Sequence, residues 1–382
     1  MNLLIDLEKT RTIATRAISP ITQPSDETIS SGEYKRFSGI PHHFYYLVFL
    51  LLVDLLGYQY LGPGEKVAYI IPIDFKGKRY TIVYAKFGMR IEYAGDGEPE
   101  EVFRLLRKGI EAVRKYYEWR AEQAAETSNL NLVSRSNQLW SKFVFLRAQF
   151  EDRSRIAGER KDEVVKTPIA VGDSFSGWSI SFPAAELAME ANWLREAAVD
   201  AFFAWTEHVL IHMAVLQGRL KTGKEVAGLV ASEWSAKCKT VFDLTDPDDK
   251  SVFDATVRLK TTTRNFVAHG SFGRDGEMFH FHSRVGAVPL RLLDSKARQE
   301  FSFFESIDPT EPEDFAVVDR FIDRLFGGTR LPARIYIESG LPTILSYAAN
   351  GNYAAALSDE AEMTNLVDHL SYESDNAANM DF

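Results

Sequence analysis

Cysteine is almost absent from this chain. Cys238 is the single cysteine among 382 residues, so no disulfide can form within one chain. Secreted proteins commonly rely on disulfides, whereas proteins of reducing compartments do without them. The first ten residues, MNLLIDLEKT, have no basic start and soon become acidic, which does not fit a secretory signal peptide. We therefore expect a cytoplasmic protein.

Long apolar runs are absent as well. The most apolar stretch, FYYLVFLLLVDLL, covers residues 44–56 and contains Asp54. A membrane-spanning helix needs about 20 apolar residues, so this stretch predicts a buried core helix and no membrane partner. Low-complexity segments and repeats of solenoid length are also missing. Because 382 residues exceed the usual size of one hydrophobic core, we expect two or three domains.

The chain as a whole has no excess of positive charge, because its net charge is −10. Affinity for nucleic acid comes largely from Lys and Arg side chains on phosphates, so the overall composition does not favour nucleic-acid binding. One stretch has the opposite sign: residues 255–300 contain eight Lys or Arg and four Asp or Glu, a local charge of +4. Either this stretch meets a phosphate backbone or its surface charge arose by chance.

The N-terminal third of the chain predicts an arm and a small α+β domain. Residues 1–35 are polar and contain Pro20 and Pro24, which predicts a loosely packed arm. Residues 36–127 predict a buried helix over 41–57, a three-stranded antiparallel meander and a helical stretch after it. The meander is expected because KVAYIIPIDF, KRYTIVYAKF and MRIEYAG alternate and are rich in Ile, Val and Tyr.

The rest of the chain predicts a helical domain with an extension on each side, so the fold class is α+β overall. Residues 128–183 are expected to form a connecting helix and a linker. Residues 184–330 predict an α-helical bundle with a β-hairpin excursion around GEMFHFHSRV. Its helices are expected over 184–218, over 223–244, from Asp246 to Gly270, and over 313–326. Residues 331–382 predict a C-terminal extension with a strand at ARIYIESG, a helix at DEAEMTNLVDHL and a disordered acidic tail, SYESDNAANMDF.

One pattern in the α+β domain suggests a metal-dependent nuclease. Restriction-endonuclease-type sites place an Asp on one strand and Glu-x-Lys on the next, and Asp74 and Lys86 have this order. Tyr84 stands where the second acid is required. Without paired carboxylates a catalytic magnesium ion lacks ligands, so a sensor or packing role is the default prediction for this domain.

The motif that points to chemistry is RNFVAHG, residues 264–270. Each helical residue turns by about 100°, so Asn265 and His269 share a helix face, and Arg264 lies about 140° away at its edge. Gly270 is a natural helix end. Two such helices packed face to face would bring both sets of side chains into one cleft.

These residue types suit RNA cleavage by the RNA's own 2′-hydroxyl group. That reaction needs a base, an acid and a cation for the charge on phosphorus. His269 titrates near neutral pH and can do either proton transfer. Arg264 can grip phosphate oxygens with its planar fork, and Asn265 can orient the imidazole or the phosphate. This chemistry requires no metal and no cofactor.

In motif and layout, residues 184–330 resemble HEPN domains. The resemblance rests on RNFVAHG, with Asn directly after Arg, and on the upstream helices EHVLIHMAVLQG and EVAGLVASEWSAKCKTV. It implies a metal-independent endoribonuclease whose composite site is shared by two copies in a homodimer. Arg264 and His269 would be the catalytic pair, Asn265 would assist, and Glu207 is the candidate acid on an earlier helix. Such proteins often belong to toxin–antitoxin or anti-phage defence systems, which implies an RNA substrate and an antitoxin or sensor partner.

An inactive module is the alternative. Some HEPN domains serve only as dimerisation or nucleotide-binding modules. In that case Arg264 would form a salt bridge with Glu207 or Asp254, and His269 would cap a helix.

The other histidines predict structural or solvated roles. His208 and His212 have metal-compatible spacing, but no third ligand is apparent, so a core or interface role is expected. His42 and His43 are expected to cap a helix or to face water. His280 and His282 are expected to face water, with the lining of an RNA path as the alternative.

Overall fold

The computed structural model describes residues 5–25, 33–171, 175–261, 279–295, 298–302 and 314–381. The protein is α+β and divides into two compact units. The first unit consists of residues 1–127 and 368–382, and the second unit consists of residues 128–367. The predicted boundary near residue 127 agrees with this division, whereas the final residues belong to the first unit.

An antiparallel sheet forms the centre of the first unit. Its strands, in the spatial order β1-β4-β3-β2, are β1 (Tyr34–Phe37), β2 (Val67–Phe75), β3 (Lys78–Ala85) and β4 (Gly88–Ala94). The turn between β2 and β3 is Lys76-Gly77, and both residues have positive φ, as a two-residue hairpin turn of this hand requires. The predicted three-stranded meander is confirmed, and β1 adds a fourth strand beside β4.

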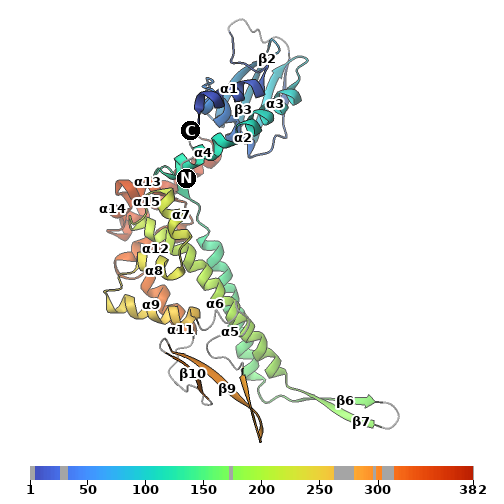
Figure 1. Ribbon diagram of the computed structural model, residues 1–382, viewed down its shortest axis with the longest axis vertical. Coiled ribbons are helices and arrows are strands. Elements are labelled where there is room, and N and C mark those ends of the chain that lie inside the picture. The colour runs from blue at the N-terminus through green and yellow to red at the C-terminus, as the bar shows by residue number, and fades with distance from the viewer. Residues whose placement is uncertain are drawn as a thin grey trace. The chain divides into compact units, whose positions relative to one another are not determined.

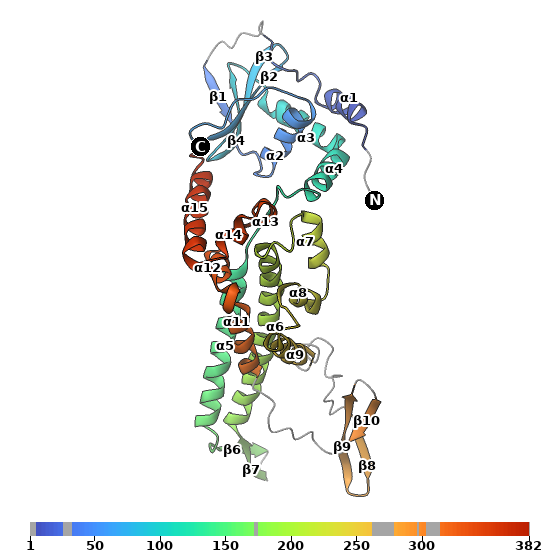
Figure 2. The ribbon, with the colours of Figure 1, turned by 90° about the vertical axis from the view of Figure 1, so that its left-hand side faces the viewer.

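Helices cover one face of this sheet, as Figure 2 shows. Alternate strand residues, including Ile71, Ile82 and Ile91, point to that face and are fully buried. The helical elements are α1 (Leu7–Ile18), α2 (Phe44–Phe49), the π-helical turn η1 (Leu50–Leu55), α3 (Pro99–Ala112) and α4 (Arg114–Ala125). The apolar run at 44–56 is therefore a core helix of this unit.

Helix α1 corrects the prediction of an N-terminal arm. The Asp6 side chain accepts a hydrogen bond from the Lys9 backbone N–H at 3.0 Å and starts the helix. Only a narrow stripe with Ala14 and Ile18 is buried, which is why the composition looked polar. A Cβ at Gly109 of α3 would lie 2.4 Å from Ile18 Cγ2, so this close packing of α1 on α3 requires glycine.

Two long antiparallel helices, α5 (Ser136–Glu159) and α6 (Pro183–Leu216), dominate the second unit. They lie side by side in Figure 1 and pack through aromatic pairs: the Trp140 and Trp205 ring centroids are 4.7 Å apart. A hairpin, β6 (Val165–Val171) and β7 (Phe175–Ser181), joins their ends. Residues 128–183 are thus part of this unit, and the predicted linker is wrong.

Four shorter helices complete this unit: α7 (Gly223–Val230), α8 (Trp234–Val241), α9 (Pro247–Leu259) and α11 (Asp314–Leu325). Helices α7 and α8 pack against α6, α11 contacts α6 through the rings of Phe321 and Phe202, and α9 packs against α11. The predicted single helix over 223–244 is two helices, because the Ser232 hydroxyl donates back to the Leu229 carbonyl at 2.7 Å and Glu233 is extended. The predicted β excursion is present as β8 (Phe279–Ser283), β9 (Gly286–Ser295) and β10 (Arg298–Ser302), three antiparallel strands in the order β10-β9-β8.

The C-terminal extension is helical where a strand and a disordered tail were expected. Its elements are the 3₁₀ turn η4 (Gly328–Arg330), α12 (Leu331–Ser339), β11 (Thr343–Ile344) paired with β5 (Asn131–Leu132), α13 (Leu345–Asn350), α14 (Asn352–Ala356) and α15 (Glu360–Asn379). ARIYIESG is the helix α12 because Ala333, Tyr336 and Ile337, at helical spacing, are all buried.

The predicted tail is ordered because its last residues bind the first unit. The Lys66 backbone N–H donates to the Met380 carbonyl at 2.8 Å, and the Lys66 ammonium pairs with Asp381. The Lys86 ammonium donates to Asn379 Oδ1 at 2.9 Å. The polar, acidic residues that predicted disorder are therefore the partners of two lysines.

Among the described helices, α6 alone is long and apolar enough to cross a membrane by length and composition. Of its most apolar 18-residue window, 78% is buried inside the protein. Such burial is typical of the core helix of a soluble protein.

Candidate functional site

The predicted catalytic residues Arg264, Asn265 and His269 lie outside the residues that the structure describes. The described chain reaches Thr261, three residues before Arg264. Helix α9 leads into the motif, so the contacts of α9 and of the candidate acid Glu207 define the surroundings of the candidate site.

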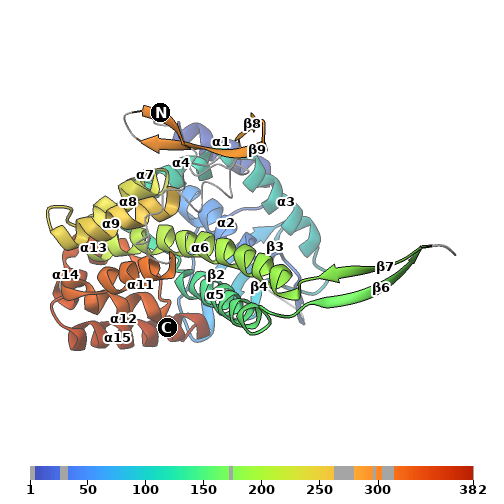
Figure 3. The ribbon, with the colours of Figure 1, turned by 90° about the horizontal axis from the view of Figure 1, so that it is seen from below.

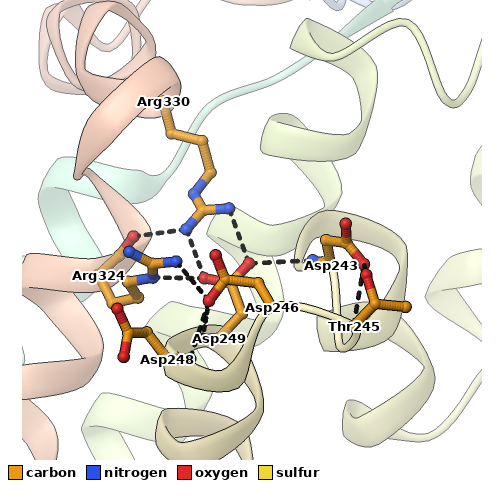
Figure 4. A network of polar contacts seen from close by, with 7 residues as sticks. All are labelled: Asp243, Thr245, Asp246, Asp248, Asp249, Arg324 and Arg330. Carbon is orange, nitrogen blue, oxygen red and sulfur yellow. Dashed lines mark hydrogen bonds and ion pairs between the residues drawn. The ribbon is translucent and has the colours of Figure 1, made fainter.

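The first turn of α9 is fixed by a buried carboxylate. Asp246 caps the helix, and its Oδ1 accepts from the Asp248 and Asp249 backbone N–H groups at 2.8 and 3.1 Å. The Asp249 side chain is 2% exposed and lies between the guanidinium groups of Arg324 and Arg330 (Figure 4). These two cations come from α11 and η4, so the start of α9 is tied to both elements.

Opposing effects act on the Asp249 carboxyl. Burial alone would raise its pKa, but hydrogen bonds from Arg330 and Arg324 outweigh burial and hold the pKa below its usual range. The Asp243 backbone N–H also donates to Asp249 Oδ2 at 3.0 Å. Asp249 is therefore an ionised, fully engaged anchor.

The far end of α9 packs against Trp234 of α8. The Phe253 and Trp234 rings are stacked with centroids 6.3 Å apart, and the Lys260 ammonium lies 5.8 Å from the Trp234 ring centroid. Trp234 Nε1 donates to Thr206 Oγ1 of α6 at 3.0 Å. One indole ring thus connects the last turn of α9 with the middle of α6.

Glu207, the predicted assisting acid, follows Thr206 on α6. Its Oε2 lies 3.1 Å from Nζ of Lys237, one turn beyond Trp234 on α8. The Lys237 side chain is 5% exposed and that of Glu207 is 33% exposed. The structure therefore brings Glu207, Lys237 and Trp234 together at the corner of α6 and α8 that the end of α9 approaches.

Lys237 and Trp234 were not among the site residues predicted from the sequence. The available signal was the spacing of Trp234, Lys237 and Cys238, which places all three on one buried helix face. The inactive alternative predicts a salt bridge from Arg264 to Glu207 or Asp254. In the structure Glu207 pairs with Lys237, and Asp254 pairs with Lys250 at 2.6 Å.

His208 and His212 have the predicted core role. His212 is buried, and its Nδ1 lies 2.6 Å from Thr343 Oγ1. His208 Nε2 accepts from the Arg135 backbone N–H at 2.9 Å. Burial, and next the neighbouring His208, lower the pKa of His212 to about 3, and burial, with the Arg135 charge, lowers the pKa of His208. Both rings are neutral near pH 7 and join α6 to the segments packed on it.

The remaining histidines are solvated where their side chains are described. His42, His43 and His282 are exposed. His43 occupies the N-cap position of α2 without a side-chain capping bond. The side chain of His280 is not among those that the structure describes.

The nuclease pattern of the first unit is not a site. Asp74 pairs with Arg79 across the β2–β3 turn and accepts from the Ser25 backbone N–H at 2.8 Å. Lys86 follows the opposite end of β3. At about 3.3 Å per strand residue, these two side chains start roughly 20 Å apart, so they cannot share one magnesium ion.

Within the described part of the chain, no group of three or more His, Cys, Asp or Glu is arranged to hold a metal ion. No known protein family, curated protein or solved structure matches the chain. The residues of the site are therefore the basis for any assignment of function.

Proposed function

We propose that the protein is a metal-independent endoribonuclease of the HEPN type, in which Arg264 and His269 of two copies form one composite site. The observation that supports this most strongly is the construction of α9. Asp249 fixes its first turn and Trp234 holds its last turn, so the segment that follows starts from a rigid base. Catalytic side chains need such support, because small displacements cost rate.

The chemistry follows from the residue types. One His269 takes the proton of the RNA 2′-hydroxyl, whose oxygen attacks phosphorus and forms a 2′,3′-cyclic phosphate. The His269 of the second copy gives a proton to the departing 5′-oxygen. Arg264 offsets the charge on the phosphoryl oxygens, and Asn265 orients the histidine. Glu207, held by Lys237, would face the same cleft.

In the cell, such a protein would be a cytoplasmic toxin or anti-phage effector whose activity is inhibited by an antitoxin or a sensor. The first unit, which has its own core, is the candidate sensor. An inactive module of the same fold is the second candidate, in which Glu207 has only a structural role as the partner of the buried Lys237.

Expression in growing cells separates the two candidates. A ribonuclease predicts that the wild-type chain arrests growth and that His269→Ala does not, at equal protein levels. Equal growth with both chains, in cells that contain the folded dimer, would favour the inactive module.

A further inference from the structure

The hairpin β6–β7 exposes large apolar side chains that nothing within the described chain covers. Figures 1 and 3 both show it extending away from the ends of α5 and α6. In its register Lys166 is opposite Ile180 and Pro168 is opposite Trp178. Directly opposite residues of an antiparallel pair point to the same side, so these four share one face, called here the hairpin face.

The two large side chains of the hairpin face are exposed to water. Trp178 is 67% exposed and Ile180 is 52% exposed. By the same register the other face carries Thr167, Ser179 and Ser181 together with Val165, which is 37% exposed, so Trp178 and Ile180 are the larger exposed side chains. An isolated two-stranded hairpin is marginally stable in water, so the exposed Trp178 and Ile180 require a cover.

A second exposed apolar surface lies at the start of α6. Glu186, Met189 and Trp193 recur at intervals of three and four, so they share one face of the helix, and Phe182 precedes them at the N-cap position. These four residues are called here the α6 stripe. Phe182 is 56% exposed, Met189 50% and Trp193 57%.

The hairpin face and the α6 stripe match each other in composition and charge. Each has three apolar side chains and one charged residue, Lys166 on the hairpin face and Glu186 on the stripe. Both charged residues are exposed, and neither forms an ion pair within the described chain. A surface and its complement on one chain fit a symmetric dimer, in which each is used twice.

The apolar area exposed on these two surfaces is close to the area that each partner buries in a stable interface. Aromatic side chains bury about 150–250 Å² each, so the exposed parts of Trp178, Phe182 and Trp193 alone offer roughly 350 Å² per chain. With Ile180 and Met189 the area approaches about 600 Å², against roughly 800 Å² per partner in stable interfaces. Patches of this size on a soluble protein mark interaction sites.

We propose that a second copy of this chain covers these surfaces: the hairpin of each copy lies across the first turns of α6 of the other, with Lys166 paired to Glu186 between copies. This dimer does not depend on the ribonuclease activity. A monomeric wild type would contradict this dimer and the composite site alike, whereas a dimer that keeps its affinity in hairpin variants overturns only the interface proposed here.

The first test is the mass of the full chain in solution, by sedimentation velocity over a range of concentrations. We expect a dimer at micromolar concentration. Trp178→Ser with Ile180→Ser should raise the dissociation constant at least about 100-fold, because each lost contact counts twice in a symmetric dimer. Phe87→Ser, which removes an even more exposed ring at a turn of the first unit, should leave the dissociation constant unchanged. A monomeric wild type, or a dimer that the double variant leaves intact, overturns the proposal.

A charge exchange tests the pairing itself and does not touch the apolar residues. Lys166→Glu and Glu186→Lys should each weaken the dimer by about tenfold, since two like-charge contacts replace two ion pairs. The chain with both changes should recover to within about twofold of the wild type. A double variant as weak as the single ones would show that these two surfaces do not meet. Wild type that stays monomeric but binds uncharged phosphatidylcholine vesicles would assign the surfaces to a membrane and overturn the dimer.

Discussion

Lys237 of α8 and Glu207 of α6 form an ion pair in which the lysine is almost entirely buried and the glutamate is partly exposed, with 3.1 Å between Nζ and Oε2. A buried ammonium group without its carboxylate is costly. The buried lysine therefore makes Glu207 important for stability whether or not Glu207 takes part in catalysis.

Glu207→Ala should lower the free energy of unfolding by about 1–3 kcal/mol, less than for a fully buried pair because Glu207 still meets solvent. Adding Lys237→Met should recover part of this loss, since no buried charge then remains. Urea unfolding of the three chains measures both effects. If the second change deepens the loss, the ammonium has other partners that stabilise it.

Asp249→Asn should cost about 3–5 kcal/mol, because two arginines then face a neutral group in a buried position. The native pKa of Asp249 is depressed. Its stabilisation is thus fully present above the unfolded pKa of about 3.9 and is lost as pH falls through the lower native value. The gap between the wild type and Asp249→Asn should be constant from pH 7 to 5 and should shrink below about pH 4. Asp254→Asn, at an exposed pair with Lys250, is the matched control and should change little.

His212 should make the protein less stable in mild acid. Its native pKa is about 3, mainly because of burial, whereas the unfolded side chain titrates near 6.5. The unfolded chain therefore takes up a proton below about pH 6.5 that the native protein does not. That uptake costs up to about 1.4 kcal/mol of stability for each pH unit. Unfolding measured between pH 7.5 and 5 should show a shallower dependence for His212→Gln. Equal slopes would mean that native His212 is charged.

Gly109→Ala should destabilise the first unit by about 1–3 kcal/mol, because the added methyl group meets Ile18 Cγ2 at 2.4 Å. Ile18→Ala in the same chain removes that atom and should relieve the effect of Gly109→Ala. Thermal unfolding of the single and double variants measures the coupling. Purely additive losses would contradict the packing of α1 on α3.

The proposed catalysis predicts a pattern across three histidine and arginine variants. His269→Ala should reduce RNA cleavage by about 10²–10⁴-fold, the usual scale for a general acid or base. Arg264→Lys keeps the charge but loses the planar fork, so it should also impair cleavage. His43→Ala, at an exposed histidine of the first unit, is the control and should cleave normally. Activity should survive EDTA and leave 2′,3′-cyclic phosphate ends. Cleavage that requires added Mg²⁺, or that His269→Ala retains, would place the chemistry elsewhere.

Local patterns predicted the elements whose neighbours lie close in sequence. The meander was predictable because Ile71, Ile82 and Ile91 alternate with more exposed residues on strands joined by short turns. Helix α9 was predictable at its start from Asp246 and its proline. In both cases the interactions that define the element are only a few residues apart.

What the sequence did not predict depends on distant partners. Helix α1 looked like an arm because its buried residues are few and small, and only the groove that receives Ile18 makes it part of a core. The alternation in β7 was hidden by the glycine and serine residues that suggested a linker. A buried Lys237 is unusual for its residue type, and its partner Glu207 lies thirty positions earlier. Pairings of this kind are set by tertiary packing and leave little trace in local composition.

The attachment of residues 379–381 to Lys66 and Lys86 has a consequence for biosynthesis. The first unit is assembled from two segments, and the entire second unit is translated between them. Domains commonly fold in order as they leave the ribosome, and the sheet and buried core of the first unit lie within residues 14–116. This core is complete early in translation, whereas Lys66 and Lys86 receive their C-terminal partners only after the whole second unit has been made.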